Sequence, residues 1–143
     1  MSTQITSALL PVAAMVGLTT VVAVAMLAQR VREMRQRRIS PRAIATSVQS
    51  GARLERVNCA DNFRNLFEVP VLFYVLCLAL ALTQLASPAM LGAAWVYVGL
   101  RAAHSAIHCT TNRVTHRFAV FAASCAVLLG MWAAFVLALI GSR

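Results

Sequence analysis

Residues 5–28 read ITSALLPVAAMVGLTTVVAVAMLA, and residues 29–42 read QRVREMRQRRISPR. The first stretch carries no charge and exceeds the roughly 20 apolar residues with which a helix crosses the hydrocarbon core of a bilayer. The second stretch is too basic to enter lipid. The first six residues of the chain, MSTQIT, lack the basic residues of a signal peptide. Together these features predict a retained membrane helix that continues into a cytoplasmic basic segment until Ser40-Pro41.

The composition of the 143-residue chain extends this conclusion to the whole protein. Hydrophobic residues make up 60% and charged residues 12%, with a net charge of +9 from thirteen arginines, no lysine and four acidic residues. Soluble domains are about 45–50% apolar and about 25% charged. No aromatic residues interleave with the densest arginine run, so we expect no nucleic-acid partner and interpret Arg30 to Arg42 as a basic belt that faces lipid.

Three further apolar stretches complete an all-α integral membrane four-helix bundle, one membrane domain over residues 1–143. The predicted spans are about 5–28, 65–86, 90–109 and 118–140, with a basic loop over 29–64. That loop holds nine arginines against three acidic residues, a net charge of +6. About eleven arginines fall on the loop side and only Arg143 clearly on the other, so we expect both termini on the non-cytoplasmic side.

Two polar stripes lie on the second and third predicted spans. In DNFRNLFEVP, residues 61–70, Asp61, Asn65 and Glu68 are spaced to share one helical face. In YVGLRAAHSAIH, residues 97–108, the same holds for a second set: Tyr97, Arg101, His104 and His108, with Arg113 and Arg117 continuing the step. The second span leaves the cytoplasmic side and the third returns to it, so the stripes lie at one depth and can meet.

Three interpretations of these stripes stay open from the residues alone. Charged groups inside spans are rare and mark functional sites, and several arginines suit a small ligand that bears carboxylates. Alternatively, Glu68 and Arg101 neutralise one another and lock the helices together. A metal site would use His104 and His108 with Glu68 or Asp61. The sequence has no H-E-x-x-H motif, so we expect no metal.

Two segments that carry these stripes resemble one known family. ERVNCADNFRNLFEVPVLFY, residues 55–74, and VYVGLRAAHSAIHCTTNRVTHRF, residues 96–118, resemble the superfamily of membrane-associated proteins in eicosanoid and glutathione metabolism, MAPEG. The shared motifs are an E-R pair before the second span, R-N-x-x-E before a proline, and R-x-x-H with two arginines after it. The resemblance implies a homotrimer that binds glutathione between subunits near the cytoplasmic face.

The resemblance also implies roles for individual residues. It assigns the glutathione site to three groups of positions: Arg64, Asn65 and Glu68; Arg101, His104 and His108; and Arg113 with Arg117. It further implies that Arg30 or Arg32 closes the site from the neighbouring subunit. Arg117 is the expected catalytic residue, because a nearby guanidinium favours the thiolate, which is the nucleophile.

The expected function is therefore a membrane-bound glutathione-dependent transferase or peroxidase that acts on lipophilic electrophiles or hydroperoxides. The alternative is a non-catalytic MAPEG-fold membrane subunit or lipid-binding scaffold. Three positions favour the alternative, because Asp61, His108 and Phe118 stand where family members commonly have arginine, tyrosine and, in one branch, serine. Arginine as the sole strong base and abundant alanine indicate a GC-rich bacterial genome, and hence a bacterial inner membrane.

Overall fold

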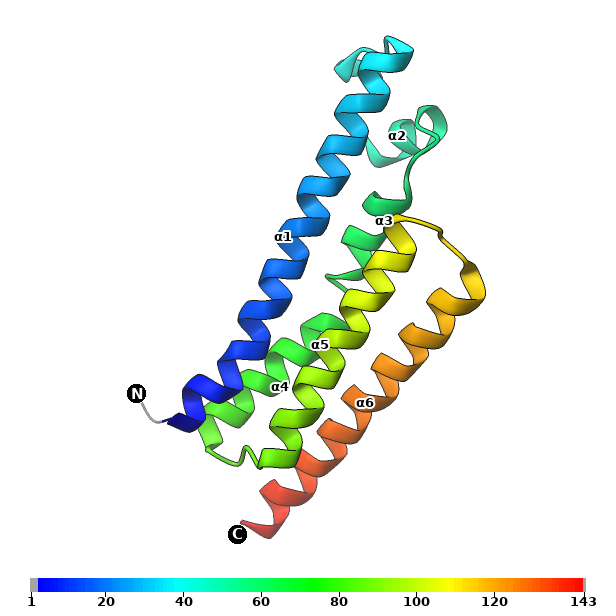
Figure 1. Cartoon of the computed structure of the whole chain (residues 1–143). Coiled ribbons are helices and arrows are strands. Elements are labelled where there is room, and N and C mark those ends of the chain that lie inside the picture. The colour runs from blue at the N-terminus through cyan, green and yellow to red at the C-terminus, as the bar shows by residue number, and fades with distance from the viewer. Residues whose placement is uncertain (1–2, 143) are drawn as a thin grey trace.

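The computed structural model describes residues 3–142, and Arg143, which we expect on the far side of the membrane, lies outside this range. The described residues form α-helices joined by short connections and one 3-10 turn (Figure 1). The elements are α1 (Thr3–Arg37), η1 (Pro41–Ile44), α2 (Ser47–Arg53), α3 (Asn58–Asn65), α4 (Pro70–Thr83), α5 (Pro88–Cys109) and α6 (Val114–Gly141). The start of α1, the α4–α5 turn and the end of α6 lie toward one end of the molecule, and α2 lies toward the other (Figure 1).

Helix α1 extends well past its apolar part into the basic segment, as the sequence predicts. It ends at Arg37, and Arg38 follows in the left-handed conformation with φ 53°. Pro41 then begins η1, preceded by Ser40 in an extended conformation. Proline disfavours helix in the residue before it, which explains the boundary.

The basic loop is held against the end of α1 by one buried carboxylate. Glu33 accepts hydrogen bonds from the backbone N–H groups of Glu55 and Arg56, at 2.7 and 3.2 Å. Arg37 donates to the same carboxylate at 3.0 Å and also to the carbonyl of Arg53. Because the residues just before α3 are tied to α1 in this way, the orientation of α3 is set from its amino end.

The second predicted span is interrupted by a break between α3 and α4. Residues 66–69 are not helical, and tight bonds of the i to i+3 type replace the regular pattern, from Phe67 N–H to Arg64 O and from Leu72 N–H to Val69 O. Pro70 causes the break, since it has no N–H and its ring clashes with the preceding turn. Glu68 therefore lies in the break and not on a continuous helical face with Asp61 and Asn65.

Within the described residues, three helical stretches are long and apolar enough to cross a membrane. They are Ile5–Arg37, Asn58–Thr83 and Val114–Gly141. The remaining predicted span corresponds to α5, which is 22 residues long but carries Arg101, His104, Ser105 and His108, all buried. These polar residues interrupt the apolar sequence of α5, whereas α1 and α6 each contain a long apolar stretch.

The helices pack through one apolar core and leave much apolar surface outside it. The core is drawn from α1, α4, α5 and α6: Met15, Val22, Phe73, Leu76, Leu80, Met90, Tyr97, Leu128, Met131 and Phe135. Large apolar side chains also face outward, among them Leu82 at 85% and Leu137 at 71% exposure. Exposed apolar surface of this extent indicates contact with lipid or with further subunits.

Helix α5 is placed by two tight connections. At its start, the Ser87 hydroxyl accepts a hydrogen bond from Met90 N–H and Pro88 occupies the first turn, which is a favourable helix beginning. At its end, the chain turns through Asn112, whose φ of 48° is left-handed, and α6 begins at Val114. Asparagine tolerates this conformation better than most residues. The turn sends α6 back alongside α5 (Figure 1).

Candidate functional site

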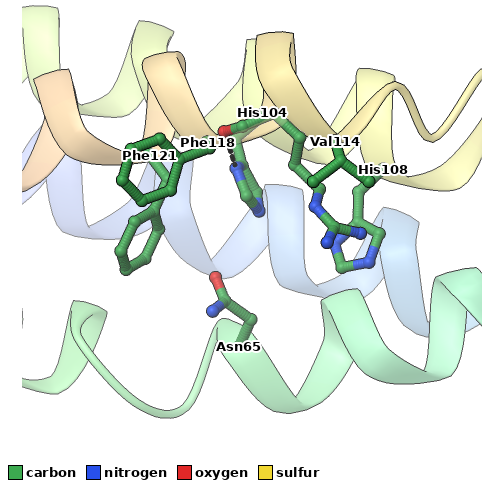
Figure 2. Close-up of a pocket in the computed structure, with 7 residues that line it drawn as sticks. Asn65, His104, His108, Val114, Phe118 and Phe121 are labelled. Carbon is green, nitrogen blue, oxygen red and sulfur yellow. Dashed lines mark hydrogen bonds between the residues drawn. The ribbon is translucent and has the colours of Figure 1, made fainter.

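A cavity of about 230 Å³ opens between α3, α5 and α6 near the α5–α6 turn. It is lined by both polar and apolar residues: Asn65, His104, His108, Val114, Arg117, Phe118 and Phe121. Asn65 reaches toward His104 from the opposite wall, and Phe118 and Phe121 lie together to one side (Figure 2). Four of the predicted site residues thus share one cavity.

The contact between the two polar stripes is a hydrogen-bonded chain centred on Asn65. Arg101 is completely buried and its Nη2 donates to both the carbonyl and the side-chain oxygen of Asn65. The Asn65 amide then donates to Glu68 Oε2 at 3.3 Å. Arg101 and Glu68 are therefore linked through a neutral amide and form no direct ion pair among the described residues.

The histidines present unsatisfied nitrogens in the cavity region. His104 is 3% exposed, and its Nδ1 donates to the Arg117 carbonyl at 3.2 Å. With Nδ1 donating, a neutral ring has an acceptor at Nε2. Neither His104 Nε2 nor His108 Nδ1 has a hydrogen-bond partner in the described part of the chain. Buried polar atoms are normally satisfied, so these two nitrogens have hydrogen-bonding capacity that a polar ligand could use.

Arg117 is held in place by two asparagines. Its Nη1 donates to Asn112 Oδ1, and the Asn112 amide donates to Asn58 Oδ1 at 3.1 Å. These bonds tie the start of α6 through the turn to the start of α3. Because the anchors are neutral amides, they fix the guanidinium without cancelling its charge. None of the described residues that line this cavity is acidic.

A second cavity, also of about 230 Å³, contains two other predicted site residues. It lies between α1, α2 and α3, and Arg30, Asp61 and Arg64 are among its lining residues. Here the basic group has an acidic neighbour, since Arg64 Nη1 lies 3.7 Å from Asp61 Oδ1. Both side chains are about half exposed, so this pair contributes little to stability.

The structure does not bring every predicted residue to the first cavity. Arg113 lines a separate hollow on another face of α6, and Arg32 is exposed on α1. The four-residue step that we extended from Arg101 to Arg117 does not continue through the turn, because Asn112 changes the chain direction there. Among the described residues, no group of three or more histidines, cysteines or acidic residues is placed to hold a metal.

Sequence reasoning missed Asn112, Asn58 and Phe121. A signal for Asn112 was present, because asparagine in a short polar connection before a helix is a frequent left-handed residue. Phe121 could have been found from its spacing, since it follows Arg117 by one helical turn on the same face. It also lies under the buried arginine, with Arg101 Cζ 5.7 Å from its ring centroid. Asn58 offered no comparable signal.

Comparison with known proteins gives one positive result. The model of the MAPEG family matches residues 8–137, which is nearly the whole chain. No curated protein and no solved structure matches.

Proposed function

The chain belongs to the MAPEG family and is an integral membrane protein, and we propose that it is a glutathione-dependent transferase or peroxidase acting on lipophilic electrophiles or hydroperoxides. Family membership is compatible both with such an activity and with a non-catalytic role. The choice between them rests on the cavity between α3, α5 and α6.

The observation that carries the proposal is the uneven polarity of this cavity. Its inner wall offers the His104 and His108 ring nitrogens and the Arg117 guanidinium, with no acidic residue to neutralise them. Its outer wall is apolar, and Phe118 is 68% exposed at the edge. A thiol tripeptide with carboxylates suits the inner wall, and a substrate dissolved in the bilayer suits the outer one.

Two lining residues, His104 and Arg117, have a defined task in the proposed reaction. The thiol loses its proton before it attacks, and His104 Nε2, which has no hydrogen-bond partner among the described residues, can accept a hydrogen bond from the thiol. Arg117 favours the resulting thiolate by its charge. In a transfer reaction the sulfur forms a bond to carbon, and the leaving group departs with the proton. In a peroxidase reaction two thiols and one hydroperoxide give a disulfide, an alcohol and water.

The proposed assembly is a homotrimer with four membrane crossings per subunit, α5 included, and both termini on the non-cytoplasmic side of a bacterial inner membrane. The trimer would complete the site. Within one subunit, the described lining of the first cavity includes neither Arg30 nor Arg32, since Arg30 lines the second cavity and Arg32 is exposed. From a neighbouring subunit either residue could supply charge to the bound carboxylates.

One observation favours the alternative, a scaffold without activity. Arg64, expected to hold glutathione, already faces Asp61 at 3.7 Å. In a scaffold the arginines would remain paired with acidic residues or lipid phosphate.

Turnover by the detergent-purified protein separates these functions. We expect glutathione to be consumed with an aryl halide or a lipid hydroperoxide, and we expect Arg117→Ala to abolish consumption while the oligomer stays intact by size-exclusion chromatography. The matched control is Arg42→Ala, which removes an exposed arginine of η1. Equal activity of wild type and Arg117→Ala would contradict the proposed role, and no turnover of either substrate class would favour the scaffold.

A further inference from the structure

The seam between α5 and α6 has a second hollow, on a different face of α6 from the first cavity. This hollow measures about 200 Å³ and is lined by Ile107, Thr111, Arg113 and His116. Arg117 of α6 lines the first cavity, whereas His116 of α6 and Arg113 at its N-cap line this hollow. The proposed thiol chemistry uses His104 and Arg117, which do not line this hollow, whereas Arg113, which the resemblance assigned to the glutathione site, lines it.

The basic groups of this hollow have no partner in the described part of the chain. Arg113 and His116 are exposed, and neither side chain makes a hydrogen bond or an ion pair within the described residues. The Arg113 side chain does not cap α6, and the residues that line the hollow in the described part of the chain include no acidic one. The positive end of the α6 dipole adds to the potential at this point. The hollow is thus a concave basic surface without a counter-charge.

The surface next to the hollow is apolar on both helices. On the face of α5 that carries Ile107, Ala103 lies about one turn and Val96 about three turns closer to the start of the helix. Both residues are exposed. On α6, Ala123 is exposed two turns beyond His116. The basic hollow therefore lies at the end of an outward apolar strip, at the α5–α6 turn that the arginine distribution assigns to the cytoplasmic boundary.

We propose that this hollow binds the phosphate of an anionic phospholipid, with the acyl chains along the apolar strip. Arginine binds phosphate oxygens through two parallel N–H groups, and the Thr111 hydroxyl can donate a further bond. Basic pockets between membrane helices on the cytoplasmic side are suited to lipid headgroups. The apolar strip identifies the occupant as a lipid and not as a free phosphate. This site is independent of the proposed enzymatic function.

Titration of the detergent-purified protein with phosphatidylglycerol tests the proposal. The thermal unfolding midpoint is followed against lipid concentration, with phosphatidylcholine of the same chains and inorganic phosphate as separate arms. We expect saturable stabilisation by phosphatidylglycerol alone. An interfacial basic residue contributes about 1 kcal/mol, or roughly fivefold in affinity, so Arg113→Gln should weaken the apparent affinity roughly fivefold. Arg113→Lys should retain most of it, and His116→Gln gives an independent second variant.

The control is Arg42→Gln, which removes one exposed arginine from the basic belt outside this hollow and should weaken the affinity less than Arg113→Gln does. Equal losses in Arg113→Gln and Arg42→Gln would overturn the proposal in favour of a diffuse basic surface. Equal stabilisation by inorganic phosphate would overturn the assignment to lipid. If Arg113→Gln does not fold, an unchanged affinity in His116→Gln overturns the proposal and a weakened one supports it.

Discussion

The two cavities beside α3 each contain an arginine of the expected glutathione site. The two arginines differ in the group that holds the guanidinium. In the cavity between α3, α5 and α6, Arg117 is anchored by the amide of Asn112. In the cavity between α1, α2 and α3, Arg64 faces the carboxylate of Asp61. An amide holds a guanidinium in place and leaves its charge for a ligand, whereas a carboxylate both holds it and offsets it. On this ground we assign the chemistry to Arg117.

The largest effect is expected from Arg117→Ala. Loss of a charge that stabilises a developing anion in such a site typically lowers the rate by about 10²- to 10³-fold. We expect kcat/KM for glutathione-dependent turnover to fall at least about 100-fold, while Arg42→Ala stays within about twofold of wild type. A similar fall in both variants would mean that turnover depends on the overall positive charge and not on the position of Arg117.

A smaller effect is expected from removal of the anchor itself. Asn112→Gly keeps the left-handed turn, since glycine adopts φ 48° freely, and deletes only the amide. The guanidinium then loses its fixed position, so kcat should fall about tenfold with little change in the unfolding midpoint. Asn112→Ala deletes the same amide but adds left-handed strain of about 1 kcal/mol, which should lower the midpoint further. Full activity in Asn112→Gly would show that Arg117 needs no anchor.

The smallest effect is expected at the paired arginine. Asp61→Asn frees Arg64 from its carboxylate, and exposed ion pairs contribute about 0–1 kcal/mol. Glutathione should bind up to about fivefold more tightly, as measured by calorimetry, with stability nearly unchanged. The matched control is Glu55→Gln, which removes an exposed carboxylate from Arg37 at 3.2 Å. If both variants gain affinity equally, the effect comes from net charge and the second cavity is not part of the site.

Much of the fold could be predicted because it follows from the apolar composition of the helices and from the residues that mark helix boundaries. The apolar stretches became helices, and Ser40-Pro41 and Ser87-Pro88 lie at helix boundaries. The meeting of the two polar stripes was also predictable, and the contact between Arg101 and Asn65 realises it. Both inferences use only helical spacing and the depth of each residue along its helix.

The rest of the site depends on two interruptions of the helical backbone, which the spacing of polar residues in the sequence does not predict. Pro70 breaks the helix just before α4, so Glu68 leaves the face that it would share with Asn65 in a continuous helix. The left-handed Asn112 ends the stripe of α5, so Arg113 lines a different hollow from Arg117. A periodic pattern predicts neighbours only within one uninterrupted helix, and both errors occurred where the helix stops.

Calorimetric titration of the detergent-purified protein with glutathione tests the assignment of the thiol site most directly. We expect saturable binding that is at least tenfold weaker in Arg117→Ala and His104→Gln and unchanged in Arg42→Ala. Absence of binding at millimolar glutathione, or binding that is equal in all four proteins, would contradict a thiol site in the cavity between α3, α5 and α6.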